Sequence, residues 1–169
     1  FLGLSCFPIS IMSLINIFYS FYFNYLDNII SYTITASLSL LLGFIFFNIG
    51  KKERDTINIY EQLFLIFLVY FLISFFILVP FYFSNYEVSF IDSYFESISG
   101  ITGTGFTIFE HIKSLDDPLI LWRSSSQWVG GFYFLIFLVL IFSNKQINFK
   151  MIHLSFNLEQ KINFSSNLL

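Results

Sequence analysis

Three glycines and two threonines occur close together in the chain, as Gly100, Thr102, Gly103, Thr104 and Gly105. Glycine adopts backbone angles that other residues resist, so carbonyl oxygens in such a stretch can point inward, and threonine adds hydroxyl oxygens. A ring of these oxygens can replace the hydration shell of a cation. The residues therefore predict a cation-binding loop, although an ordinary extracellular loop with turn glycines would contain the same residue types.

A short apolar segment with acidic residues precedes this loop. About ten apolar residues cannot cross a hydrocarbon core, which takes about 20 as helix, so we expect the segment to enter the membrane and turn back. Asp92 or Ser89 can cap a short helix over residues 93–99, and Gly100 can end it. The negative end of that helix would favour a cation. Glu96 would add to this field, hold the loop through hydrogen bonds, or bond backbone as a scaffold residue.

The composition is that of a membrane protein. Of the 169 residues, 56% are hydrophobic and only 11% are charged, and the mean hydropathy of +0.76 excludes a soluble globular domain. A net charge of -3 gives no basic surface for nucleic acid. One cysteine, Cys6, excludes an internal disulfide, and His111 and His153 add no metal motif. Without a nucleophile–base pair or a phosphate loop, neither an enzyme nor a cofactor is expected.

Four long apolar segments predict four transmembrane helices. Residues 1–23 and 29–49 contain no Asp, Glu, Lys or Arg, and their short connection predicts a helical hairpin. A third helix is expected over residues 62–83 and a fourth over residues 117–142. The predicted fold is an all-α membrane protein in which the hairpin precedes a module of helix, re-entrant pore helix with filter loop, and helix.

Cap signals mark the starts of the third and fourth helices. Asn58 with Glu61 three residues later has the form of a capping box, which places a helix start near Ile59. Asp117 followed by Pro118 is typical of a cap with proline in the first helical turn.

The distribution of positive charge predicts an orientation. Lys113 and Arg123 fall on one side of the predicted spans, and the other Lys and Arg fall on the opposite side, at positions 51, 52, 54, 145, 150 and 161. By the positive-inside rule, the N-terminus, the connector and the tail are expected in the cytoplasm and the glycine loop outside.

Further residues of the fourth segment have ordinary structural interpretations. Arg123 and Trp128 would anchor the helix at the membrane interface, and Gly130 with Gly131 would allow close helix packing. The tail after Ser143 fits either a helix face or a strand, and we favour an interfacial helix.

Several motifs together carry a family resemblance: Glu61 after a charged connector, Pro80 and Phe81, and residues 92–100, 102–107, 121–123 and 127–131. In this order they resemble the amino-terminal part of a Trk/Ktr/HKT-type potassium transporter, most like the bacterial Trk potassium-translocating membrane subunit. That family builds one pore from four helix–loop–helix repeats of a single chain, and Trk-type members add two helices in front.

The resemblance implies a division of the chain. Residues 1–50 would be the leading helix pair, 51–61 a cytoplasmic connector, and 62–143 the first repeat. Residues 144–169 would be a cytoplasmic or interfacial segment that leads to missing repeats. The protein would lie in the bacterial inner membrane as a homodimer, in contact with lipid and with a cytoplasmic nucleotide-binding regulatory subunit.

The resemblance also implies potassium uptake and a site for K⁺. The carbonyls of Thr102, Gly103, Thr104 and Gly105 would form one quarter of the selectivity filter, supported by Asp92, Glu96 and Gly100. Two positions depart from the family pattern, because the first loop usually has threonine in place of Gly103 and a small residue in place of Phe106. This leaves K⁺ over Na⁺ selection open.

Two other functions fit the residues. The chain could be a self-assembling cation channel, or a non-conducting membrane scaffold or permease subunit in which residues 100–105 are a packing loop. The substitution Gly105→Ser separates them, because a packing loop predicts altered stability and a filter predicts altered ion selectivity.

Overall fold

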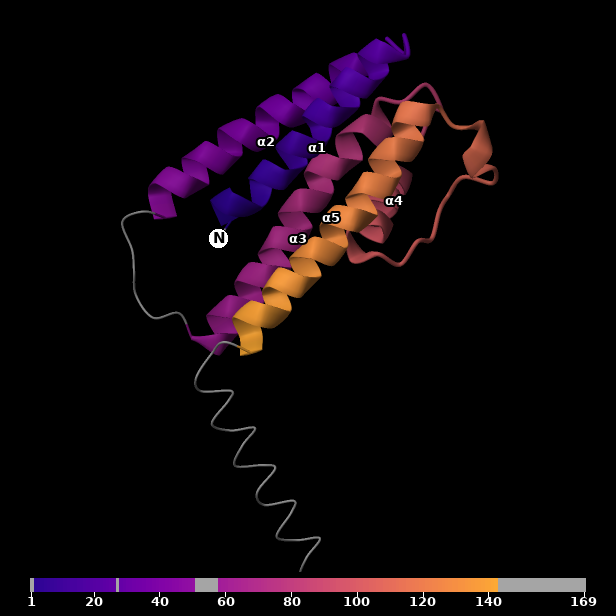
Figure 1. The fold of residues 1–169 in the computed structure, drawn as a ribbon. Coiled ribbons are helices and arrows are strands. Elements are labelled where there is room, and N and C mark those ends of the chain that lie inside the picture. Colours follow the sequence, from indigo (N-terminus) through magenta and orange to yellow (C-terminus); the bar gives the residue numbers. More distant parts are fainter. Residues whose placement is uncertain (1, 27, 51–57, 143–169) are drawn as a thin grey trace, which may run out of the picture. The chain divides into compact units, whose positions relative to one another are not determined.

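The computed structural model describes residues 2–26, 28–50 and 58–142. In these residues the elements follow in the order α1 (Leu2–Tyr22), α2 (Ile29–Gly50), α3 (Ile59–Tyr82), α4 (Phe90–Thr102), the short 3-10 helix η1 (Ile112–Ser114) and α5 (Asp117–Phe142) (Figure 1). This described part holds no strand, which confirms the all-α prediction. The connector at 51–57, His153 and the tail from 143 lie outside the described residues.

Four of the helices are long and apolar enough to cross a membrane: α1, α2, α3 and α5. They contain 21 to 26 residues, which at about 1.5 Å per residue reach the thickness of a hydrocarbon core. The predicted spans are thereby confirmed, with ends that differ by a few residues. Helix α4 has 13 residues and a length of about 20 Å, so it is too short to span.

Helices α1 and α2 form the predicted hairpin and lie side by side (Figure 1). A Cβ atom on Gly3 would overlap backbone atoms of Phe47 and Gly43, so the two helices approach closely at that point. Nearby, the rings of Phe7 and Phe44 meet edge to face with centroids 5.5 Å apart. Small residues and interlocking rings thus replace the hydrophobic effect, which does not draw helices together in lipid.

Helices α3 and α5 begin where their cap signals predicted. The Asn58 amide donates a hydrogen bond to the Glu61 carboxylate at 3.0 Å, as in a capping box, and α3 starts at Ile59. Helix α5 starts at Asp117, with Pro118 in its first turn.

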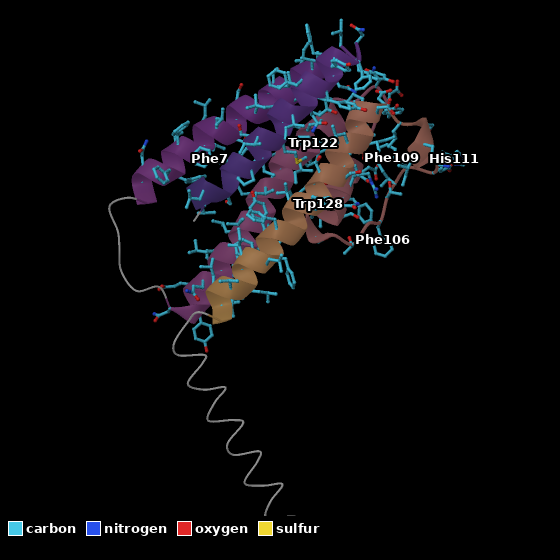
Figure 2. All side chains as sticks on the ribbon, viewed as in Figure 1. Phe7, Phe106, Phe109, His111, Trp122 and Trp128 are labelled. Carbon is cyan, nitrogen blue, oxygen red and sulfur yellow. The ribbon has the colours of Figure 1, made fainter. Side chains whose placement is uncertain are left out.

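The chain divides into two compact units, residues 1–133 and 134–169, and α5 enters the second. In the first unit, Trp122 joins α5 to the other helices. Its indole N–H donates to the carbonyl of Ile77 on α3 at 3.0 Å, and its ring lies 5.4 Å from that of Tyr32 on α2. Figure 2 shows Trp122 among the helices and Trp128 projecting from α5, where it is 82% exposed.

The two tryptophans provide a matched test of this packing. We expect Trp122→Phe to lower the stability by about 1–3 kcal/mol, because it removes the bond to Ile77 and leaves a small cavity. Trp128→Phe should change stability by less than about 0.5 kcal/mol, since an exposed side chain loses little. Thermal unfolding of both variants in detergent micelles would measure this, and equal effects would contradict the buried position of Trp122.

Candidate functional site

Helix α4 carries the predicted loop at its C-terminal end and is capped at its start by Ser89. The Ser89 hydroxyl accepts a hydrogen bond from the Asp92 amide at 3.2 Å and donates to the Asp92 carboxylate at 2.7 Å. Ser89 is therefore the cap, and the helix is longer at both ends than the predicted range 93–99. Asp92 lies in the first turn, about 16 Å along the helix from the loop, so it does not contact the glycines.

Gly100 does not end α4, and this prediction was wrong. The helix continues to Thr102 and stops at Gly103, whose φ of 70° is left-handed and whose amide donates to the Gly100 carbonyl at 3.0 Å. Gly100 has a packing role instead, because a Cβ atom there would overlap the Ser126 hydroxyl of α5. Its lack of a side chain lets α5 approach α4.

Gly130 lets α5 approach the same end of α4. A Cβ atom on Gly130 would overlap the carbonyl of Ile101, whereas one on Gly131 would meet nothing within 4 Å. The close-packing interpretation therefore holds for Gly130. Together with Gly100, it brings the α5 backbone beside the last turn of α4.

The loop folds back onto the end of α4 through Ser99. The Ser99 hydroxyl donates to the carbonyl of Phe106 at 2.6 Å, and the Ser99 carbonyl accepts from the amide of Thr104 at 3.1 Å. Gly105 takes a positive φ of 77°, a backbone conformation that would be strained for a residue with a side chain. The two left-handed glycines and Ser99 thus close a compact loop.

An ion pair between α4 and α5 supports this loop. Glu96 is 1% exposed and accepts from the Arg123 guanidinium at 2.5 Å through one oxygen and from the Ile108 amide at 3.1 Å through the other. A second guanidinium nitrogen of Arg123 donates to the carbonyls of Gly105 at 3.0 Å and Phe106 at 3.4 Å. Glu96 therefore holds the loop through hydrogen bonds, as one of its predicted roles required.

Arg123 and Ser99 are the site residues that sequence reasoning missed. Interfacial anchoring was predicted for Arg123, but the guanidinium turns to Glu96 and the loop, and the side chain is 12% exposed. One signal was available, since Glu96 and Arg123 are opposite charges in otherwise apolar segments, and buried charges pair.

The four predicted ion-binding residues follow one another from the last residue of α4, Thr102, to Gly105, and all four are exposed. The Thr102 hydroxyl donates to the Ile98 carbonyl at 2.7 Å, and the Thr104 hydroxyl lies 3.2 Å from that of Ser99. Among the described residues, no hydrogen bond ends on the carbonyl oxygens of Thr102, Gly103 or Thr104. Only the Gly105 carbonyl has a partner, Arg123. Three carbonyl oxygens of the loop are thus uncommitted and chemically suited to a hard cation.

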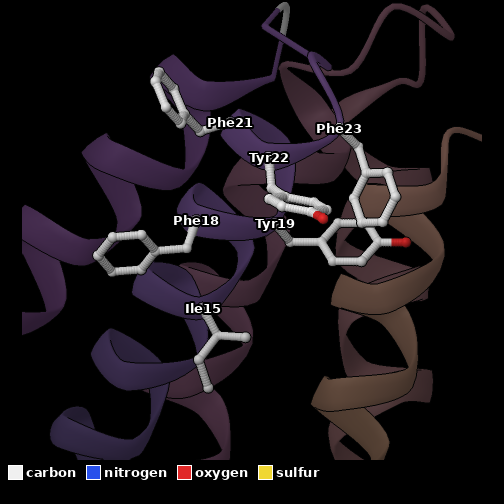
Figure 3. Close-up of a pocket in the computed structure, with 6 residues that line it drawn as sticks. All are labelled: Ile15, Phe18, Tyr19, Phe21, Tyr22 and Phe23. Atoms are coloured by element: carbon white, nitrogen blue, oxygen red, sulfur yellow. The ribbon is translucent and has the colours of Figure 1, made fainter.

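Other parts of the described chain are less suited to an ion. No group of three or more His, Cys, Asp or Glu in the described residues could hold a metal. His111 is exposed before η1 and points away from the helices (Figure 2). A shallow pocket near the end of α1 is lined by six apolar or aromatic side chains: Ile15, Phe18, Tyr19, Phe21, Tyr22 and Phe23 (Figure 3). Most of them are exposed, as expected for a surface that faces lipid.

A polar network joins the hairpin to the start of α5. The Asp116 carboxylate accepts from the phenol of Tyr86 at 3.0 Å and from the amide of Asn28 at 3.2 Å, and the Tyr25 phenol donates to Asp117 at 3.2 Å. Burial and the bond to Asp116 raise the pKa of Tyr86, and the bond to Asp117 raises the pKa of Tyr25. Both phenols therefore remain protonated donors at neutral pH.

Comparison with known proteins identifies relatives over much of the chain. An uncharacterized cation transporter of Methanocaldococcus jannaschii is 26% identical over 79% of this chain and 27% of its own length. The Trk system potassium uptake protein TrkI of Halomonas elongata is 46% identical over 35% of this chain and 12% of its own length. TrkH of Escherichia coli is 28% identical over 66% of this chain and 23% of its own.

The chain therefore spans at most about a quarter of the length of these relatives. No protein-family profile and no solved structure matches it.

The ion pair can be tested by a double-mutant cycle. Arg123→Gln should lower stability by about 3–5 kcal/mol, because it leaves the buried Glu96 carboxylate without its counter-charge. The double variant Glu96→Gln with Arg123→Gln should recover part of that loss. Unfolding in detergent would give the coupling energy, with Lys113→Gln on the exposed 3-10 helix η1 as a neutral control. Additive effects of the two substitutions would show that the pair is not formed.

Proposed function

Because the chain is a relative of the Trk-type potassium transport proteins, we propose that it takes part in moving potassium ions across a membrane. Four helices suited to spanning a bilayer support a multi-pass protein with this role. On this proposal the chain belongs to a membrane transport protein rather than to an enzyme, and K⁺ is the cargo.

We propose further that residues 102–105 form the first of four filter loops. One observation carries this proposal. Ser99, Glu96 and Arg123 hold the loop by hydrogen bonds and an ion pair, while the carbonyl oxygens of Thr102, Gly103 and Thr104 accept no hydrogen bond from the described residues. Carbonyl oxygens that are held in place, and not used for folding, can replace water around a potassium ion. The C-terminal end of α4 adds a partial negative charge on the order of half a unit beside them.

The proposed filter loop must be shielded from lipid by other parts of the protein. Residues 102–106 are exposed, and Phe106 is 69% exposed, yet irregular backbone at membrane depth must be enclosed by protein. We propose that α4 is re-entrant and that further repeats of the same chain enclose the loop and supply the rest of the filter. On this reading residues 1–50 are the leading pair and 62–143 the first repeat.

Several features of the proposal concern the whole protein. A location in the bacterial inner membrane with a cytoplasmic N-terminus, a homodimeric assembly and a cytoplasmic nucleotide-binding regulatory subunit all stay predictions. They follow from the family resemblance and from the positive-inside rule.

Gly105→Ser tests the filter role. The left-handed φ of 77° strains a serine, while nothing lies within 4 Å of the added Cβ, so the change acts through the backbone and not through a clash. We expect K⁺ over Na⁺ preference of the full gene product to fall by roughly tenfold, the equivalent of about 1.4 kcal/mol. The measurement is uptake of each ion in a host that lacks its own potassium uptake.

Gly131→Ser is the matched control, because its Cβ also has open space but its backbone is helical. It should leave ion preference unchanged. If Gly105→Ser lowers the amount of folded protein and leaves ion preference intact, the loop is a packing element and the scaffold function is the better account.

A further inference from the structure

Buried polar atoms without a protein partner gather in the α1–α2 hairpin. In the part of the chain that the structure describes, six buried side-chain nitrogen or oxygen atoms have no hydrogen-bond partner. Five of them belong to the hairpin: Ser13 Oγ, Asn16 Oδ1, Ser20 Oγ, Asn28 Oδ1 and the Tyr32 hydroxyl. Each of these five side chains is at most 2% exposed.

These five atoms lie on two helices, or at the start of one, that pack against each other. Ser13, Asn16 and Ser20 are spaced by three and four residues, so they share one face of α1 over about 10 Å. Asn28 and Tyr32 are one turn apart at the start of α2, and α1 and α2 pack along each other. The polar atoms therefore extend from the turn of the hairpin toward the middle of its length.

The two serines of this set, Ser13 and Ser20, differ from other hydroxyl-bearing residues of the hairpin. Other hydroxyls of the hairpin donate to carbonyls of the preceding turn: Ser5, Ser31, Thr33, Thr35, Ser37 and Ser39. The hydroxyls of Ser13 and Ser20 make no such bond and have no other hydrogen-bond partner in the described residues.

The two asparagines already use their amide hydrogens. The Asn16 amide nitrogen donates to the Met12 carbonyl at 3.0 Å, and that of Asn28 donates to the Asp116 carboxylate at 3.2 Å. These bonds fix the side-chain orientations and leave both amide oxygens as acceptors without donors.

A buried polar atom without a partner is costly, and more so at membrane depth. Several such atoms on two packed helices can provide the two to four polar partners that an internal water molecule needs. We propose that a row of internal water molecules lies along the interior face of the hairpin, held by the five atoms above. Asn28 connects this row to Asp116, which is half-exposed, so the water enters from the end of the molecule where the hairpin turns.

Radiolytic hydroxyl-radical labelling of the full gene product in lipid nanodiscs tests the proposal, because radicals form from water beside the labelled side chain. Tyr32 and Met12 are 0% and 4% exposed, and Phe81 is 0% exposed on α3. After correction for intrinsic reactivity, we expect Tyr32 and Met12 to be oxidised several-fold faster than Phe81, because the proposed water lies beside the first two side chains and not beside the third. Equal, slow labelling of all three would overturn the proposal.

Two variants separate a row of bound water from transient opening. Asn16→Leu removes the central acceptor and should reduce labelling of Tyr32 and Met12 several-fold, while Ser39→Ala, whose hydroxyl bonds its own helix, should not. Labelling that neither variant changes would mean that water reaches Tyr32 through opening of the hairpin, and would also overturn the proposal. Should Asn16→Leu fail to fold, Ser20→Ala gives the same comparison.

Discussion

The ion pair between Glu96 and Arg123 is the interaction on which the loop depends. Burying either charge alone would be unfavourable by several kcal/mol, so the two charges must pair with each other and make further hydrogen bonds. Glu96 accepts from both Arg123 and the Ile108 amide, and Arg123 reaches two carbonyls of the loop. A lysine has no planar fork and could not make these bonds together. The pair thereby fixes α4, α5 and the loop relative to one another.

Glycines make this geometry possible in two different ways. Gly100 and Gly130 lack side chains where α4 and α5 touch, and this contact brings Arg123 within reach of Glu96. Gly103 and Gly105 take left-handed angles that end the helix and turn the chain back over it. The first two serve helix packing and the last two serve backbone conformation. The packing glycines determine where the loop is held, and the left-handed glycines determine its course.

Local signals predicted most of the fold, and long-range contacts were out of their reach. Four spans followed from length and hydropathy, and the starts of α3 and α5 from cap residues. A glycine that stops a helix and a glycine that packs against another helix are identical in sequence, so the role of Gly100 needed the position of Ser126. The bond from Arg123 to Glu96 crosses 27 residues, and no periodicity encodes it. For the site, residue types indicated the loop, but its support came from tertiary structure.

The position of Arg123 raises a physical question for a cation-binding loop, because its guanidinium bonds the Gly105 carbonyl directly. Two unit positive charges about 5 Å apart at an effective dielectric constant of about 20 repel by about 3 kcal/mol. Glu96 compensates, since its carboxylate lies against the same guanidinium and makes the pair neutral. Arg123 can then orient the loop without excluding K⁺. It also occupies the Gly105 carbonyl, which leaves the oxygens of Thr102, Gly103 and Thr104 as the proposed ligands of the ion.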